Sequence, residues 1–168
     1  GLFETYDQIC QFEKPSAIER DLAFVPALSG LGCPYWDRTA GGLWIGLSLD
    51  TRQSDLMQSI LEGIVFRAAE VIAAMSEFIS IKNEISIDGG VTANPYFCQF
   101  LADVLNRRII VQSLAELTAF GTAKLTAGNN IDQKMRDSLA RQYQPETDRR
   151  QYLEKFKDAV NRSVQWRS

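Results

Sequence analysis

Histidine is absent from the 168-residue sequence, and cysteine occurs only three times, at Cys10, Cys33 and Cys98. No pair of cysteines has the CxxC spacing, so a zinc site built from Cys and His ligands is excluded. Cysteines that are odd in number and far apart in sequence are typical of a reduced protein. The sequence therefore predicts a cytoplasmic location.

Uninterrupted apolar runs and a secretion signal are also missing. The apolar stretch at residues 60–74 is broken by Glu62, Arg67 and Glu70, so we expect no membrane span and no membrane partner. No charged segment followed by an apolar core begins the chain. The first residue is Gly1 rather than Met, which favours an excised piece of a longer protein or a processed chain.

Basic residues are too few and too scattered to suggest nucleic-acid binding. The chain has 18 Lys and Arg against 21 Asp and Glu, and the densest basic spots are only pairs, at residues 107–108 and 149–150. Binding to a phosphate backbone needs a continuous basic surface, so we expect no nucleic-acid partner. The apolar content of 45% is sufficient for one hydrophobic core, which predicts one domain or a large part of one.

The spacing of apolar residues predicts an α/β architecture. Helical and strand-like segments follow one another between turn signals such as Gly, Pro and Asn. The predicted helices are residues 4–12, 54–78, 95–105, 113–128 and a tail from Thr147, and the predicted strands are residues 22–28, 42–47, 84–87 and 108–111. The order strand, helix, strand, helix over residues 84–128 predicts a parallel pair of strands with a crossover helix.

The predicted helix at residues 54–78 carries two apolar stripes, so we expect it to be covered on two sides. The first stripe comprises Leu56, Ile60, Ile64, Val71, Met75 and Phe78, and the second comprises Met57, Leu61, Val65, Ala68 and Ile72.

A glycine pair follows the predicted strand at residues 84–87, in the order Asp88, Gly89, Gly90. Two adjacent glycines leave backbone bare where a flat or anionic ligand can approach it, and the helix start behind them offers free N–H donors. A structural interpretation is equally open, in which the glycines make a tight turn and Asn94 only caps the helix that Pro95 begins.

A second and longer pattern lies upstream. Residues 42–47 (GLWIGL) are followed after seven positions by Asp55 and Leu56, and after two more by residues 59–62 (SILE). This pattern matches the C-terminal signature of the FGGY carbohydrate kinases at every specified position. Residues 24–37 (FVPALSGLGCPYWD) resemble the glycerol kinase version of the preceding segment, and residues 117–123 (LTAFGTA) resemble another helix of the family.

The resemblance extends over about residues 23–128 and implies a fold. The FGGY family has ribonuclease H-like, actin-like ATPase lobes, so the expected fold class is α/β, with parallel strands and crossover helices. Residues 1–168 would form a partial C-terminal, nucleotide-side lobe whose first strands are missing, and the N-terminal catalytic lobe would be absent. Two residues depart from the family pattern: Gly41 stands where Arg is usual, and Phe120 where Leu is usual.

The resemblance also implies a site and an activity. Gly89, Gly90 and Asn94 match the positions beside the adenosine, although helix capping by Asn94 would occupy the same side chain. No catalytic residue is expected here, because the family's general base is an Asp of the N-terminal part. The parent protein would use ATP and Mg²⁺ to phosphorylate a small polyol or sugar, foremost glycerol, giving glycerol 3-phosphate and ADP. This chain alone would be inactive.

Two alternatives remain open at the level of sequence. The substrate could be xylulose, ribulose or another short polyol, or the chain could be a non-catalytic nucleotide-binding or oligomerisation module. A sheet that lacks its first strands exposes an edge, so we expect a homo-oligomer or association with the missing N-terminal part.

Other conspicuous side chains have structural interpretations. We expect Glu62 to make a buried hydrogen bond, and Trp36 to serve in packing or at an interface. The carboxylates Asp37, Asp55, Asp88 and Asp103 are expected at turns, helix starts and strand ends.

Overall fold

A computed structural model of the chain describes residues 3–111 and 141–167. Its strands are β1 (Ala23–Val25), β2 (Leu43–Ile45), β3 (Glu84–Ile87), β4 (Arg108–Val111) and β5 (Arg141–Tyr143), and its α-helices are α1 (Gln53–Ser76), α2 (Pro95–Leu105) and α4 (Leu153–Asn161). Short 3-10 helices span Tyr6–Ile9, Ile18–Arg20, Gly90–Ala93 and Arg150–Tyr152. The predicted helix at residues 113–128, including the segment 117–123, lies outside the described residues.

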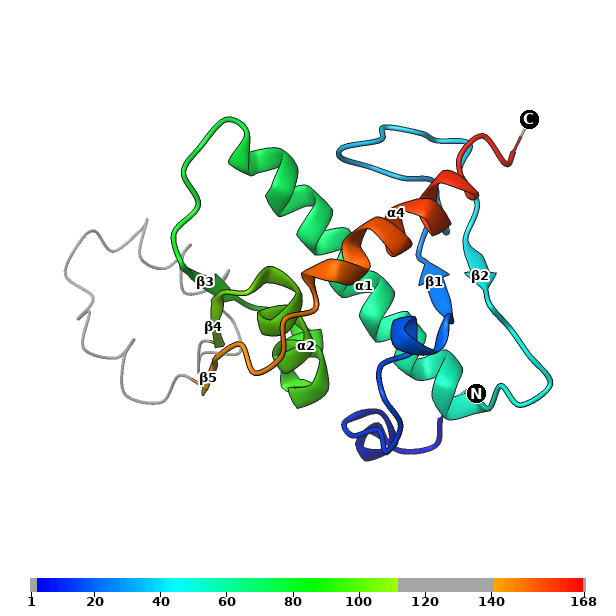
Figure 1. The fold of residues 1–168 in the computed structure, drawn as a ribbon, viewed down its shortest axis with the longest axis horizontal. Coiled ribbons are helices and arrows are strands. Elements are labelled where there is room, and N and C mark those ends of the chain that lie inside the picture. Colours follow the sequence, from blue (N-terminus) through cyan, green and yellow to red (C-terminus); the bar gives the residue numbers. More distant parts are fainter. Residues whose placement is uncertain (1–2, 112–140, 168) are drawn as a thin grey trace, which may run out of the picture.

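The strands form two separate sheets. Strands β1 and β2 pair antiparallel, with Phe24 opposite Trp44. Strands β3 and β4 pair parallel, as the sequence predicts, and α2 lies between them along the chain. Strand β5 adds antiparallel to β4 and was not predicted, because residues 141–143 (RQY) show no apolar alternation. Figure 1 shows the two sheets at opposite ends of the molecule, with α1 running between them.

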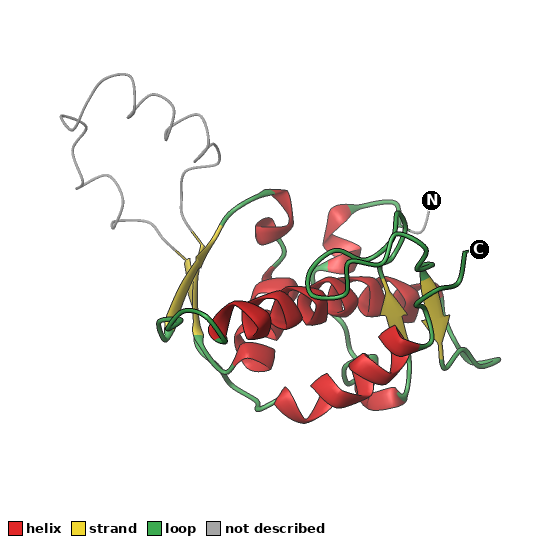
Figure 2. Ribbon diagram, turned by 90° about the horizontal axis from the view of Figure 1, so that it is seen from above, coloured by secondary structure: helices red, strands yellow, loops and turns green. Residues whose placement is uncertain are grey.

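Helix α1 is the central element, and the core forms where other elements meet it (Figure 2). Phe66 of α1 stacks on Phe156 of α4 with ring centroids 4.8 Å apart, and it meets Phe100 of α2 edge-on at 5.6 Å. Val25 of β1 is also part of this buried cluster. The four-residue spacing of Phe156 and Val160 correctly predicts the buried face of α4.

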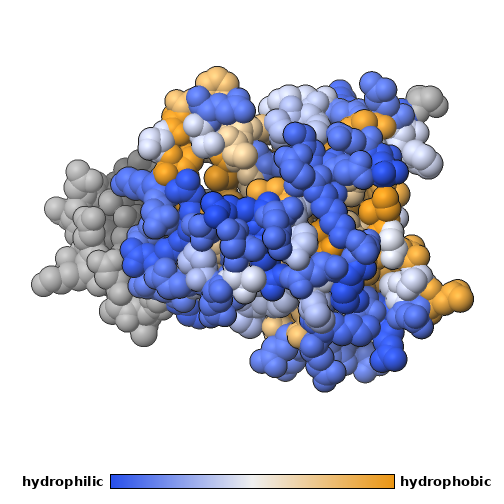
Figure 3. Space-filling model, viewed as in Figure 1, coloured by the Kyte–Doolittle hydropathy of each residue, from blue (hydrophilic) through white to orange (hydrophobic). Residues whose placement is uncertain are grey.

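The two stripes of α1 have different surroundings. Met57, Leu61 and Val65 of the second stripe are buried. Ile64 and Met75 of the first stripe are exposed, and so is Phe78 (85%), which lies beyond the end of α1. Leu56, Ile60 and Val71 of the same stripe are half-buried, so the prediction of cover on two sides holds only in part for the described residues. Figure 3 shows apolar surface over the C-terminal end of α1.

No helix in the described part of the chain is both long and apolar enough to cross a membrane.

A buried carboxylate links α1 to two other segments. Glu62 is 2% exposed, and its Oε1 accepts hydrogen bonds from the Ala17 amide (2.7 Å) and the Tyr96 hydroxyl (2.6 Å). Its Oε2 accepts from the Ile18 amide (3.0 Å). The structural role predicted for Glu62 is confirmed, since it joins the segment before β1 to α1 and α2.

The glycine that follows Glu62 permits the closest approach in the core. A Cβ atom at Gly63 would lie 2.1 Å from the carbonyl oxygen of Phe24, far inside van der Waals contact. Only glycine therefore allows α1 to lie this close to β1. A similar limit holds at Gly46, which has a φ of +87° and would place a Cβ 1.8 Å from the Asp21 carbonyl oxygen.

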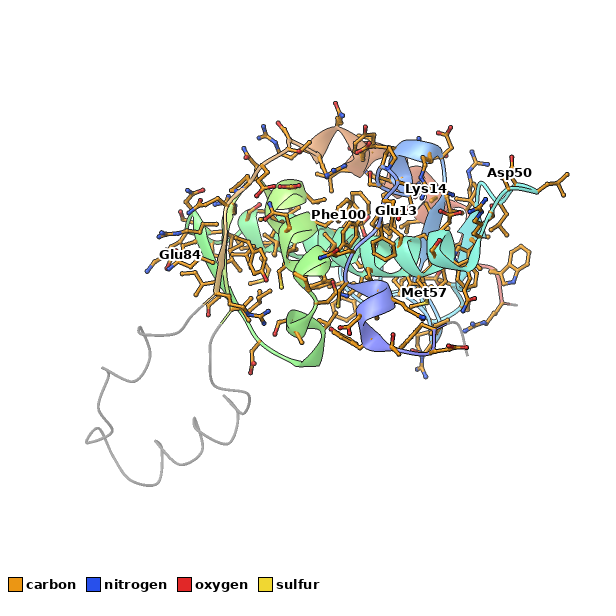
Figure 4. The ribbon with its side chains drawn as sticks, turned by 90° about the horizontal axis from the view of Figure 1, so that it is seen from below. Glu13, Lys14, Asp50, Met57, Glu84 and Phe100 are labelled. Carbon is orange, nitrogen blue, oxygen red and sulfur yellow. The ribbon has the colours of Figure 1, made fainter. Side chains whose placement is uncertain are left out.

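The remaining polar residues of the signature also stabilise local structure. Asp55 accepts from the backbone amide of Arg52 (2.9 Å) at the start of α1 and forms an ion pair with Lys14 (3.0 Å). Figure 4 shows Lys14 beside the first half of α1. Ser59 accepts a hydrogen bond from the indole of Trp44 (3.0 Å), which ties α1 to β2. These signature positions thus determine packing.

The departure at Gly41 has a local explanation. A Cβ atom there would lie 2.7 Å from the ring of Trp166, and the Gly41 amide donates to the Ser163 carbonyl (2.9 Å). The C-terminal tail thus occupies the space that a side chain at position 41 would need.

We predict that Gly63→Ala destabilises the chain. Helix propensity alone would favour Ala over Gly by about 1 kcal/mol, whereas the contact with the Phe24 carbonyl should lower the free energy of unfolding by about 2 kcal/mol net. Urea unfolding measures the difference. Gly32→Ala is the control, because a Cβ there meets no atom within 4 Å. Equal stability of both variants would contradict the close packing of α1 on β1.

A second prediction concerns pH. Burial raises the pKa of Glu62 from 4.5 to about 7, although its hydrogen bonds to Tyr96 and the two amides act in the opposite direction. A folded-state pKa above the unfolded value means stabilisation that is complete below pH 4.5 and lost as pH rises through 7. The free energy of unfolding should fall by about 3 kcal/mol between pH 4.5 and pH 8 through this group.

Glu62→Gln provides the matched comparison, because the amide has the same shape and does not titrate. Urea unfolding across this pH range should show the extra fall in the wild type only. Parallel pH profiles for the two proteins would show that Glu62 has no raised pKa.

Candidate functional site

The glycine pair lies at the carboxyl end of β3, next to the parallel neighbour β4. Gly89 has φ +105° and ψ 166°, a backbone conformation that essentially only glycine adopts. Gly90 begins the 3-10 turn Gly90–Ala93. Both glycines are exposed, and a Cβ atom at either would meet nothing within 4 Å. The turn therefore presents bare backbone to open space.

Thr92 fixes this turn from within, and sequence reasoning did not single it out. Its backbone amide and its hydroxyl both donate to the carbonyl oxygen of Gly89, at 3.0 and 2.7 Å. The side chain is buried beneath the turn. A hydroxyl residue three positions after a turn glycine was the available sequence signal.

Asn94 lies behind the turn and is 1% exposed. Its Oδ1 accepts from the Phe97 amide (3.0 Å), which caps α2, and its Nδ2 donates to the Ile9 carbonyl (2.7 Å). The capping alternative is thus what the structure supports. A direct contact between this amide and a ligand would require one of the two hydrogen bonds to break.

The other candidate carboxylates have partners that account for them. Asp37 accepts from the Thr39 amide and hydroxyl, both at 2.7 Å, and these bonds lower its pKa. Asp103 accepts from the backbone amide of Glu146 (2.9 Å). Asp88 is exposed at the end of β3. Asp37 and Asp55 lie at a turn and at a helix start, as predicted, whereas Asp103 lies within the last turn of α2 and binds the segment that precedes α4.

Trp36 differs from its expected packing role. It is 76% exposed and has a φ of +51°. The described residues leave its ring largely uncovered, so the packing interpretation is wrong within the described part of the chain. The interface interpretation stays a prediction.

A cavity of about 490 Å³ lies away from the glycine turn, at the start of α1. It is lined by Phe3, Glu4, Gln8, Ile9, Gln53, Ser54 and Met57. The turn itself lies on an open surface. We favour the turn as the candidate site because its exposed backbone offers hydrogen-bonding groups at the carboxyl end of a parallel strand. A ligand bound at the turn needs contacts on its other side as well, and the described residues do not supply them.

Comparison with known proteins places the chain in a family. Residues 5–129 match the model of the C-terminal domain of the FGGY family of carbohydrate kinases. Glycerol kinase of Thermococcus gammatolerans is 39% identical over 153 residues, which is 85% of this chain and 31% of that protein. Glycerol kinase of Mycoplasma pneumoniae is 35% identical over 161 residues, or 89% of this chain and 32% of that protein.

Solved structures agree on the fold. Plasmodium falciparum glycerol kinase with ADP superimposes with a TM-score of 0.76 at 26% identity, covering 96% of this chain and 34% of that one. Xylulose kinase from Lactobacillus acidophilus gives a TM-score of 0.68 at 22% identity, with the same coverage. The chain spans about a third of the length of the relatives it matches. The expected α/β fold class is confirmed, and the chain belongs to the FGGY family of carbohydrate kinases.

Proposed function

We propose that the protein to which this chain belongs transfers the γ-phosphoryl group of ATP to a primary hydroxyl of glycerol, giving glycerol 3-phosphate and ADP. The chain contributes the adenosine side of the cleft. The observation that carries this proposal is the bare, exposed backbone of Gly89 and Gly90 at the carboxyl end of a parallel strand. The names of the matched relatives favour glycerol among the family's substrates.

The nucleotide site follows from this backbone. In the proposed complex the nucleoside lies against Gly89 and Gly90, where added side chains would stand between the ligand and the peptide groups. Asn94 contributes by holding the start of α2 behind the turn. The Plasmodium falciparum structure was solved with ADP, which supports a nucleotide as the ligand of this fold.

The catalytic groups belong to the rest of the parent protein in this proposal. Among the described residues, no three Asp, Glu or Cys side chains come together as metal ligands. The Gly89–Gly90 turn would hold only the adenosine of ATP, whereas Mg²⁺ would be held by the phosphates and by groups of the rest of the parent protein. When bound, Mg²⁺ neutralises charge on the transferring phosphoryl group.

We also propose that the parent acts in the cytoplasm and that this chain associates with its remaining lobe.

A coupled assay for ADP release tests the activity. The full-length protein should turn over with glycerol and MgATP, and a panel with xylulose, ribulose and other polyols tests the alternative substrates. The 168-residue chain alone should show no turnover. Activity of the isolated chain, or ATP binding without transfer to any polyol by the full-length protein, would refute the proposal.

Gly90→Val tests whether the nucleoside lies against the backbone of Gly90. The branched side chain fits the fold, because a Cβ at Gly90 meets nothing and its φ is not positive, yet it occupies the space proposed for adenosine. In the full-length enzyme the KM for ATP should rise about tenfold, with less than about a twofold change in the KM for glycerol. Gly32→Val, at another exposed glycine with open space, is the control. An unchanged KM for ATP would remove Gly90 from the site.

A pair of substitutions at Asn94 tests the helix cap. Asn94→Ser keeps an uncharged side-chain oxygen that can accept from the Phe97 amide and loses the donor to Ile9, whereas Asn94→Ala loses both. Thermal and urea unfolding should show Asn94→Ala less stable than Asn94→Ser by about 1 kcal/mol. Equal stability of the two variants would show that the helix cap contributes nothing.

A further inference from the structure

The Gly89–Gly90 turn is linked to β5 through the carbonyl oxygen of Thr92. This oxygen accepts a hydrogen bond from Nη2 of Arg141 (2.8 Å) and a weaker one from the Cys98 thiol of α2 (3.3 Å). Thr92 in turn holds Gly89 through two hydrogen bonds to one carbonyl oxygen. A chain of contacts thus runs from Arg141, 49 positions along the sequence, to the exposed glycine.

Such a link matters because the two glycines themselves restrict the backbone conformation of the turn very little. Glycine has the largest conformational freedom of any residue, and two in succession on an open surface have no side chains to restrict them. A ligand that needs one backbone geometry binds more weakly when that geometry must first be ordered. A hydrogen bond from a guanidinium is stronger than one between neutral groups, so it restricts its acceptor more effectively.

We propose that Arg141 is a positioning residue for the nucleotide, which acts by holding the Gly89–Gly90 turn in its binding geometry through Thr92. This inference rests on the proposed nucleotide site. In this proposal the effect of Arg141 passes through the backbone of residues 89–92 rather than through contact with the nucleotide. Strand β5, which showed no apolar pattern in the sequence, therefore has a role at the site.

Arg141→Met tests the proposal, because Met keeps much of the apolar stem and removes the donors. Arg141→Lys retains a cationic donor but loses the planar guanidinium group with its several N–H donors. Arg162→Met is the matched control, since Arg162 is an exposed arginine that pairs with Asp158 on α4. The KM values for ATP and glycerol are measured in the full-length enzyme, and amide hydrogen exchange of residues 88–94 is measured in the same proteins.

Arg141→Met should raise the KM for ATP about fivefold, with kcat and the KM for glycerol within about twofold of wild type. Exchange at residues 88–94 should become faster, Arg141→Lys should lie between, and Arg162→Met should match the wild type. A residue that only stabilises the fold would lower the melting temperature without this selective effect on ATP.

The outcomes separate this inference from the proposed function. If Gly90→Val raises the KM for ATP and Arg141→Met changes neither that KM nor the exchange, the nucleotide site stands and the positioning role is overturned. If neither variant changes the KM for ATP, the proposed site fails together with the inference. If Arg141→Met does not fold, Arg141→Lys decides: wild-type KM and exchange in that variant would assign Arg141 to fold stability and overturn the proposal.

Discussion

The carboxylate of Glu62 is the contact on which the arrangement of the other elements depends. It lies near the middle of α1 and accepts hydrogen bonds from the segment before β1 and from α2. A buried charge or acid is tolerated only when its oxygens have donors, so these donors must be brought to the position of Glu62. Gly63 then sets the distance between α1 and β1. Once α1 is fixed, α2 and the strand before it have defined positions.

The family signature and the candidate site are therefore separate parts of the molecule with different physical requirements. The signature positions Asp55, Ser59 and Glu62 act through side chains that hold segments together. The candidate site would act through backbone that glycine leaves accessible. A ligand bound this way would be selected by the shape of the turn and by its peptide groups. The backbone geometry of the turn therefore matters, and it depends on the hydrogen bonds that Thr92 makes to Gly89.

Part of the surface of the described chain is typical of an interface. Ile64 and Met75 of α1 and Phe78 just after it are exposed, and β3 has no hydrogen-bonded neighbour on its outer edge among the described strands. The relatives are about three times as long as this chain. Association with the remaining part of the parent protein would bury such a face and pair such an edge.

Sequence periodicity and turn chemistry determined α1, α2, α4, the parallel pair β3–β4 and the position of the glycine pair, because these depend on local spacing of apolar residues and on the backbone freedom of glycine. The structural role of Glu62 also followed from a charged residue within an apolar helix. Strand β5 could not be found this way, because it is a short polar edge strand that is held by its neighbour β4. Only the tertiary structure decided that the Asn94 amide is buried and hydrogen-bonded, and that Arg141 reaches Thr92 from 49 positions away, because these contacts join residues that no local pattern connects. It also decided which apolar residues of α1 stay exposed, since that depends on which elements pack against the helix.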